Sequence, residues 1–573
     1  MPALPASLNP PAHLPARGGL RAAEPGLPLR LFAARREWGW ALLAGLLFAA
    51  VLALPYLLGY GLARPGEFFT GVVMNPEDSQ TYFAKMVQGH AGLWQYSIPF
   101  TPEPHQPAFV GGFYLALGQL ARWLSVPLIA VWHGSRLAMG LLLALATFLF
   151  CATFLKGRAA RWTGYVLALT GSGLGWLLLV WQPAWLPGMP MDFRMPEAHL
   201  FFTGLTYPHV AAGTALLLLG FWLFLQADHA GRRAPLFGLL AGLTNLGLAI
   251  AYPYLIYLVV ATLGLYALFG SGAGRLWRRG LLAALALGPP TPLIAYYAIV
   301  QQQNPVFRRW AEQAVTPSPA WPHFLFAFGP LLLLALPALG RRGRSLLAGR
   351  EGILWAWLVA AGLLLLLPLY PQRRFVQGAH APLSILAAAG LFATLLPAPR
   401  STRAFRWLAA RPRYSAPGLE RWLLTLLLAF MALSNVYLLA DVSFSAAAAH
   451  RYPFFRSTAE RQALAWLDGA ATQADVIMAS YETGNYVAGQ LGLRVVVGHW
   501  AETADWDAKM ALVERFYAPS TGAAERRRLL EEWNITLVWW GAQERQLAGS
   551  EGELAGPFEA VYSNDEVTIY AAR

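Results

Sequence analysis

Long apolar runs fill the first three quarters of the chain and predict membrane-spanning helices. Each is about 17 residues or longer, enough for a helix to cross the hydrocarbon core of a bilayer. Eleven runs are found: 38–60, 126–155, 162–181, 206–226, 235–250, 253–271, 281–300, 323–340, one ending near Tyr370, one ending before 398, and 422–440.

Arginine-rich segments alternate with these runs and predict their orientation. Arg30, Arg35 and Arg36 precede the first run, and segment 398–421 holds six arginines. Because cytoplasmic loops carry an excess of Lys and Arg, we expect these segments and the N-terminus on the cytoplasmic side. This orientation places residues 61–125 in a long loop on the outer side of the membrane. Its half-apolar stretch PAFVGGFYLALGQLARWL is expected as a helix in the outer interface, not as a crossing.

Residues 442–573 show a different pattern, in which short apolar strands alternate with helices. DVIMAS, RVVVGH and ITLVWWG predict strands, and FEAVYSNDEVTIYA predicts a hairpin turning at Asn564-Asp565. Ser457 and Glu460 match a capping box that opens a helix. This alternation predicts a small α/β domain, expected outside the cytoplasm because the eleventh run leads outward.

The predicted fold class is therefore a polytopic α-helical membrane protein of about eleven transmembrane helices with a C-terminal extracytoplasmic α/β domain. We expect a disordered cytoplasmic tail over 1–37, a transmembrane domain over 38–441 with its large outer loop 61–125, and the α/β domain over 442–573. A mean hydropathy of +0.43, with 57% hydrophobic and 13% charged residues, agrees with this class.

The distribution of charge along the chain limits the kinds of partner that we expect the protein to bind. The net charge is +13, but residues 1–441 carry +19 and residues 442–573 carry −6. The basic surplus thus belongs to the membrane part, where it reflects topology and contact with lipid headgroups, and it does not indicate nucleic-acid binding. The single cysteine, Cys151, lies inside an apolar run and offers no disulfide or thiol site.

The strongest candidate for chemistry is the acidic pair Glu77-Asp78, in GVVMNPEDSQTYFAKM just past the first run. Residues 1–441 hold only 13 carboxylates, so two adjacent ones at a membrane surface are unusual. They could supply a general base, or hold a divalent cation (Mg or Mn) that bridges a phosphate. An equally weighted alternative makes Asp78 a solvated N-cap of the following helix.

Arg373 and Arg374 form a second candidate, in an outer loop of nine residues over 371–379. Outer arginines oppose the positive-inside bias, so they call for an explanation. A guanidinium binds a phosphate or diphosphate bidentately, and this reading is favoured. The alternative is that both side chains extend to lipid phosphates of the outer leaflet.

Weaker candidates lie near these two. Tyr82 and Lys85, four and seven residues beyond Asp78, share its helix face and could contact substrate phosphate or sugar, although local ion pairing of the lysine is favoured. His105, before Gln106-Pro107, is weaker still.

A second weaker group lies in the outer segment MPEAHLFFTGLTYPHV. Glu197 and His199 could line the same outer cavity as His209 and share a proton or a metal, or form only an interfacial hydrogen-bonded pair. In the C-terminal domain, His499, Trp500 and Glu502 could form a polar patch or simply open a capped helix.

Taken together, the arrangement resembles the bacterial C-type glycosyltransferases, integral membrane enzymes that use polyprenyl-phosphate-linked sugars. The resemblance spans most of 38–520 and rests on the acidic pair in the first outer loop, then HQPAFVGGFYLALGQLA, then WHGSRLAMG. The segments PEAHLFFTGLTYPHVAAGTALLL, YPQRRFVQGAHAPLSILAAAGL and ASYETGNYVAGQLGLRVVVGHWAET add to it. The family motif maps to Asp78 with Glu77 as its neighbour. The family often has Asp-Glu or a lone Asp, so the order Glu-Asp departs from it.

The resemblance implies inverting transfer of a sugar from a polyprenyl-phosphate lipid to an extracytoplasmic glycan, lipid or protein at the bacterial plasma membrane. A carboxylate at 77–78, directly or through a divalent metal, would activate the acceptor hydroxyl. Arg373 or Arg374 would hold the donor phosphate.

Two other classes stay open from the sequence. A transporter or an envelope-assembly scaffold would have a midplane site with broken helices and polar residues. The runs contain almost no mid-membrane acids, which weighs against an ion-coupled transporter. A catalytically dead relative would point its carboxylates to bulk solvent, away from the arginine pair.

Overall fold

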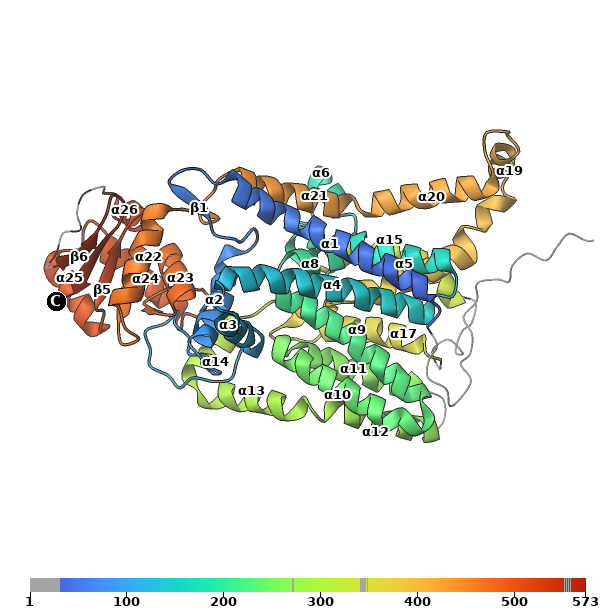
Figure 1. Cartoon of the computed structure of the whole chain (residues 1–573), viewed down its shortest axis with the longest axis horizontal. Helices are drawn as coiled ribbons and strands as arrows, with labels where there is room; N and C mark the ends of the chain where they lie inside the picture. Colours follow the sequence, from blue (N-terminus) through green and yellow to red (C-terminus); the bar gives the residue numbers. More distant parts are fainter. Residues whose placement is uncertain are drawn as a thin grey trace, which may run out of the picture.

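The computed structural model describes residues 31–269, 273–340, 347, 349–550, 552, 554, 556 and 558–572. In this part a bundle of long helices carries a mixed α/β domain at one end (Figure 1). The first helix, α1, begins at Arg35. The tail expected over 1–37 lies outside the described residues as far as residue 30.

Six helices of the described part are long and apolar enough to cross a membrane. Many of their large apolar side chains are exposed, such as Leu47 and Leu57 on α1, as lipid-facing surfaces require. The innermost is α9, whose core is mostly buried. The six are α1 (Arg35–Leu62), α4 (Leu128–Phe154), α9 (Pro208–His229), α10 (Ala234–Ala251), α15 (Trp321–Gly340) and the stretch Gln372–Ser401 around α18 (His380–Gly390).

Three further expected runs are helix pairs bent at a short break. Two consecutive prolines, Pro289 and Pro290, stand in one break, where a helix cannot keep its hydrogen bonds. In another, the hydroxyl of Ser172 donates to the carbonyl of Met431, so a distant helix holds the bend. The pairs are α5 (Arg158–Thr170) with α6 (Gly175–Trp181), α12 (Ala273–Leu287) with α13 (Thr291–Gln303), and α20 (Ala416–Met431) with α21 (Leu433–Val442), bent by 45°, 58° and 41°.

The last two runs match the shorter apolar helices α11 (Leu255–Phe269) and α17 (Gly352–Leu365), of 15 and 14 residues. A multi-pass helical membrane protein with a C-terminal sheet domain is thus confirmed. The number eleven stays a prediction, because six to nine of these units meet the length expected of a span.

The first loop folds onto the end of the bundle that carries the α/β domain (Figure 1). It contains β1 (Glu67–Phe69), α2 (Pro76–His90) and α3 (Gly112–Leu124). Helix α3 has 13 residues, about 20 Å, which is too short to cross. It packs tightly on α2 through glycines, since a Cβ on Gly118 would lie 2.1 Å from the carbonyl oxygen of Met86. The stretch expected not to cross is thus a short helix against the protein.

The C-terminal domain is built on a five-stranded mixed sheet of order β4-β3-β5-β7-β6. Strand β3 runs parallel to β4 and β5, and β7 runs antiparallel to β5 and β6. The hairpin expected at Asn564-Asp565 joins β6 to β7. The strands are β3 (Val476–Met478), β4 (Arg494–Val495), β5 (Leu537–Trp540), β6 (Phe558–Ser563) and β7 (Thr568–Ala572).

Five helices flank this sheet, and the last was not expected from the sequence. Ser457 caps the first of them by accepting from the backbone N–H of Glu460, while the Glu460 side chain faces Arg456 rather than completing the box. They are α22 (Thr458–Ala470), α23 (Tyr481–Leu491), α24 (Trp506–Tyr517), α25 (Ala523–Glu532) and α26 (Ala542–Ala548).

A strand pair and a shared apolar core are among the contacts that join the α/β domain to the first loop. Strand β2 (Phe455–Ser457) pairs antiparallel with β1 across the chain, an element not expected from the sequence. One face of the five-stranded sheet, including Ile477 and Trp539, shares an apolar core with Ala84 and Leu115 of the first loop. The opposite face packs on its own helices. The domain is therefore seated on the bundle end and not tethered loosely to it.

Candidate functional site

Asp78 lies in the first turn of α2. Asn75 is the N-cap, with a left-handed φ of 40°, and Pro76 occupies the first helical position. The alternative in which Asp78 itself caps the helix is therefore wrong, because Glu77 and Asp78 are already inside it. A carboxylate in this turn is stabilised by the positive end of the helix dipole.

The carboxylate of Asp78 meets an imidazole from the C-terminal domain. His499 Nε2 lies 2.9 Å from Asp78 Oδ1, and 39% of the Asp78 side chain remains accessible. Burial alone would raise the pKa of Asp78, but the hydrogen bond from His499, with the charges of His499, Arg374 and Arg373, lowers it below its usual value. Asp78 is therefore a reachable carboxylate whose ionised form is favoured by His499 and by the charges of the two arginines.

Glu77 points elsewhere. Its side chain hydrogen-bonds to Tyr481 of the C-terminal domain, and its carbonyl accepts from the side chain of Asn485. Successive residues of a helix diverge by about 100°, so the two adjacent carboxylates do not converge on one ligand. Among the described residues no cluster of three or more His, Cys, Asp or Glu side chains could hold a metal ion. The divalent cation expected at Glu77 and Asp78 stays a prediction.

Arg373 and Arg374 lie in a short 3-10 helix, η2 (Gln372–Val376). Arg374 Nη1 donates to the hydroxyl of Tyr252 at 2.9 Å, and its guanidinium lies over the rings of Tyr252 and Tyr254. Arg373 Nε lies 3.9 Å from Glu197 Oε1. Within the described residues, this Nε is buried without a hydrogen-bond partner.

Aromatic side chains fill the space beside Asp78 and Arg374. The ring of Tyr82 stacks on Tyr114 at 4.5 Å, and the hydroxyl of Tyr114 lies 2.7 Å from His209 Nδ1. Burial, followed by the charge of Asp78, raises the pKa of Tyr82. The predicted residues Tyr82 and His209 are thus brought together with the acidic turn and the arginine pair.

Lys85 does not face this group. It is 3% exposed and forms a 2.8 Å ion pair with Glu502, whose other oxygen accepts from Tyr96 at 2.5 Å. Burial lowers the pKa of Lys85 although Glu502 opposes the shift. A direct contact with substrate does not fit this placement. The favoured alternative, ion pairing, does fit, but with a partner 417 residues away.

The other histidine candidates also have structural partners. His105 accepts from the backbone N–H of Ile98 at 2.9 Å and so fixes its own loop. His199 is fully buried, with Nε2 3.6 Å from Asp192, while Glu197 lies beside Arg373. Glu197 and His199 thus have different neighbours and do not form the shared proton or metal pair that their spacing suggested.

Sequence reasoning weighed His499 and Glu502 only as a patch or a helix start, and it missed Tyr481 as the partner of Glu77. For His499 and Glu502, the available signal was their position directly after the buried strand RVVVG, since polar residues at strand ends often line functional sites. The loop that carries them is held by Gln313 of α14 (Pro305–Gln313), whose amide donates to the carbonyl of Thr503 at 2.8 Å.

No protein-family model matches the sequence, and no curated protein matches it either. Solved structures do resemble it in fold. ArnT from Cupriavidus metallidurans bound to undecaprenyl phosphate superposes with a TM-score of 0.50 and 11% identity, over 94% of this chain and 99% of that chain. The Archaeoglobus fulgidus oligosaccharyltransferase in the apo form gives 0.50 and 13%, over 88% of this chain and 69% of that chain.

The same archaeal enzyme, AglB, in complex with an inhibitory peptide and a dolichol-phosphate, gives a TM-score of 0.50 and 13% identity, over 89% of this chain and 70% of that chain. At such identities the likeness concerns the fold. The chain therefore has the fold shared by these C-type glycosyltransferases.

Proposed function

We propose that the protein is a membrane glycosyltransferase that moves a sugar from a polyprenyl-phosphate lipid to an extracytoplasmic acceptor. The observation that carries this proposal is a set of packed rings, Tyr82, His209 and Tyr252, that links the turn of the accessible Asp78 to Arg374 at one end of the bundle. The fold adds support, because ArnT and AglB were solved with undecaprenyl phosphate and dolichol-phosphate respectively.

In the proposed reaction, Asp78 accepts the proton of the acceptor hydroxyl as the oxygen attacks the anomeric carbon of the donor. The new bond is oxygen to anomeric carbon. The bond that breaks joins this carbon to the phosphate oxygen, which leaves with the electron pair as polyprenyl phosphate. Attack opposite the leaving group inverts the anomeric centre. Arg373 and Arg374 stabilise the charge that develops on the phosphate.

The proposal places this chemistry on the extracytoplasmic side, with the N-terminus in the cytoplasm, since the arginine-rich segments lie in the opposite loops. The proposed acceptor is a glycan, lipid or protein of the envelope, and the proposed sugar is a hexose or pentose. A transporter is less well supported, because the candidate groups Asp78 and Arg374 lie at the bundle end that carries the α/β domain.

A divalent cation at Asp78 would need further ligands, and Glu77 faces Tyr481. The proposed mechanism therefore runs on the residues of the chain alone. Transfer measured with and without a chelator tests the predicted Mg or Mn requirement directly.

The test is transfer from a panel of radiolabelled polyprenyl-phosphate sugars in membranes, with Asp78→Asn and Glu77→Gln variants. Loss of the base should lower the rate about 10²- to 10⁴-fold in Asp78→Asn, while Glu77→Gln should stay within a few-fold of wild type. Expression level and unfolding temperature control for folding.

Two outcomes would overturn the proposal. One is a folded Asp78→Asn variant that transfers at the wild-type rate. The other is a wild type that turns over no donor, together with an unchanged envelope glycan profile in cells carrying either variant. The second result would favour the scaffold alternative.

A further inference from the structure

The C-terminal domain contributes a side chain to the proposed catalytic centre. His499 is the residue that touches Asp78, and it follows β4 on a loop that the bundle itself holds through Gln313. Its imidazole is mostly buried, at 7% side-chain exposure. Within the described residues its Nδ1 has no hydrogen-bond partner. The contact with Asp78 is thus the main polar anchor of this ring.

We propose that His499 is a positioning residue that orients Asp78, so that docking of the C-terminal domain completes the centre. This inference rests on the proposed function. His499 Nε2 is hydrogen-bonded to Oδ1 of Asp78. The other carboxylate oxygen, Oδ2, therefore remains available to accept the proton of the acceptor hydroxyl. His499 itself takes up no proton in the reaction. It holds one carboxylate oxygen, as the orienting member of a catalytic pair does.

Several groups besides His499 face Asp78 and set its charge state. Arg373 and Arg374 come from η2, and their charges lower the pKa of Asp78 together with His499. Tyr82 on α2 and Tyr481 on α23 also lie near Asp78, whose negative charge adds to the rise that burial causes in the pKa of each hydroxyl. Tyr207, directly before α9, lies near the same carboxylate. His209, at the start of α9, also senses this charge. Removal of His499 should leave the arginines in place and shift the pKa of Asp78 only in part.

The test uses the full-length protein with His499→Ala and His499→Gln. Without the imidazole, the pKa of Asp78 should rise, so the acidic limb of kcat/KM should move to higher pH. The maximal rate should fall about 10- to 100-fold. The glutamine amide can still donate to Asp78 Oδ1, so His499→Gln should recover much of the rate. A merely structural role of His499 would change stability without moving the pH profile.

A second readout does not depend on turnover. Carbodiimides modify protonated carboxyl groups, so the pH midpoint of Asp78 labelling, followed by mass spectrometry, reports its pKa. A higher midpoint in His499→Ala than in wild type supports the inference even if no donor in the panel is used. Equal midpoints, or a folded His499→Ala variant with wild-type rate and pH profile, would overturn it. Failure of the proposed function shows separately, as absence of wild-type transfer.

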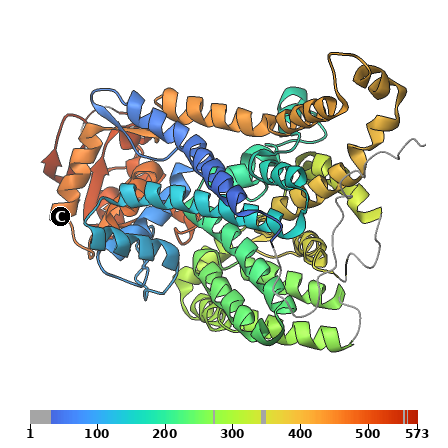
Figure 2. The ribbon, with the colours of Figure 1, turned by 45° about the vertical axis from the view of Figure 1, so that its right-hand side comes forward.

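The opposite end of the molecule carries an independent candidate site. A hairpin around α19 (Arg403–Ala409) projects from the bundle end away from the α/β domain (Figures 1 and 2). Segment 398–421 holds six arginines and one carboxylate, Glu420, which pairs with Arg400. Five exposed arginines therefore lack a carboxylate within ion-pair distance among the described residues: Arg403, Arg406, Arg411, Arg413 and Arg421.

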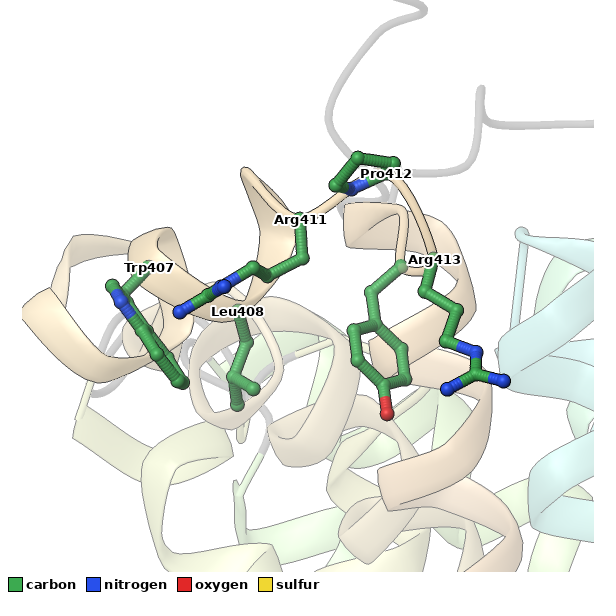
Figure 3. Close-up of a pocket in the computed structure, with 6 residues that line it drawn as sticks. Trp407, Leu408, Arg411, Pro412 and Arg413 are labelled. Atoms are coloured by element: carbon green, nitrogen blue, oxygen red, sulfur yellow. The ribbon is translucent and has the colours of Figure 1, made fainter.

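This hairpin forms a small pocket lined by Trp407, Leu408, Arg411, Arg413 and Tyr414, with Pro412 at its turn. Figure 3 shows the guanidinium of Arg411 beside the indole of Trp407, and the cation lies 4.3 Å from a ring centroid. Trp407 is 59% exposed. Exposed aromatic side chains next to unpaired arginines match the chemistry of a membrane surface with anionic headgroups.

We infer that this pocket binds the headgroup phosphate of an anionic phospholipid of the adjoining leaflet. Arg411 and Arg413 would contact the phosphate, and Trp407 and Tyr414 would lie among the headgroups. The inference does not depend on the proposed enzyme activity, since the site lies at the other end of the molecule.

Native mass spectrometry of the detergent-purified protein tests it, with phosphatidylglycerol and phosphatidylcholine as probes. Wild type should retain phosphatidylglycerol preferentially, and Arg411→Gln with Arg413→Gln should reduce that retention several-fold. The matched control is Arg527→Gln with Arg528→Gln, two exposed arginines on α25 with the same loss of charge. Equal retention in both double variants, equal retention of the two lipids, or full competition by inorganic phosphate would overturn the inference.

Discussion

The arginines that pack between helices have different partners at the two ends of the bundle. At the end away from the α/β domain, Arg161 binds both oxygens of Glu37, with the shortest contact at 2.7 Å, and also donates to two backbone carbonyls. Asp228 there receives Arg278, Arg279 and the hydroxyl of Tyr266. Each of these guanidinium groups has a carboxylate in hydrogen-bonding contact.

At the end that carries the α/β domain, the arginines have weaker partners. No carboxylate lies within ion-pair distance of Arg374 in the described part of the chain, where the hydroxyl of Tyr252 and two aromatic rings receive it. Arg373 approaches Glu197 only to 3.9 Å. The arginines that stabilise the fold thus have carboxylate partners within the chain. Arg373 and Arg374 instead keep hydrogen-bond donors available for an anion from outside the chain. The difference locates the proposed phosphate site better than charge count alone.

The largest expected effect is a loss of stability when an arginine with a carboxylate partner is removed. Arg161→Ala should leave the Glu37 carboxylate buried without its partner, at a cost of about 3–5 kcal/mol in the free energy of unfolding. The unfolding temperature in detergent should fall markedly. An Arg161→Ala variant that unfolds at the wild-type temperature would show that a carboxylate partner does not distinguish structural arginines from Arg373 and Arg374.

An intermediate effect is expected at Arg374. In Arg374→Lys the charge remains, but the bidentate fork is lost, so kcat/KM for the lipid donor should fall about 10- to 100-fold, equivalent to about 1.5–3 kcal/mol. The unfolding temperature should change little, because no carboxylate is left unpaired. The measurements are initial rates against donor concentration and thermal unfolding of the same preparations. A large loss of stability with unchanged kcat/KM would assign Arg374 to structure instead.

The smallest effect is expected at Glu197. In Glu197→Gln the weak competitor for Arg373 loses its charge, so polyprenyl phosphate should bind a few-fold more tightly, about 0.5–1 kcal/mol. Titration of the purified protein with the lipid phosphate measures this change, with Glu312→Gln on exposed α14 as control. Weaker binding in Glu197→Gln would mean that Glu197 holds Arg373 in place for the ligand.

Much of the architecture follows from local pattern. Apolar length placed a helix at every expected run, because the hydrocarbon core sets that length whatever the fold. The bend at Pro289-Pro290 has a local signal in the sequence, but not every bend does. The break after α5 depends on Ser172 contacting Met431, 259 residues away in sequence. The strand pair β1 and β2 also joins segments that lie far apart in the chain.

The candidate site also combines residues that the sequence pattern predicts with residues that only the structure reveals. The rarity of carboxylates singled out the pair Glu77-Asp78 from the sequence alone. The position of the arginines against the positive-inside bias singled out the pair Arg373-Arg374. Choosing between Glu77 and Asp78 required the start of α2, because one position along a helix turns a side chain away by about 100°. The partners His499 and Glu502 are more than 400 residues from Asp78 and Lys85, and no local pattern reports such a contact.

The distance along the chain between Asp78 and His499 has a consequence for biosynthesis. A ribosome inserts the acidic turn and most of the bundle before it has made the imidazole that completes the pair. A chain that stops early can therefore enter the membrane and even capture a lipid phosphate through Arg373 and Arg374, yet it lacks the orienting group. Under the proposed function, a chain truncated before His499 should therefore be no more active than His499→Ala.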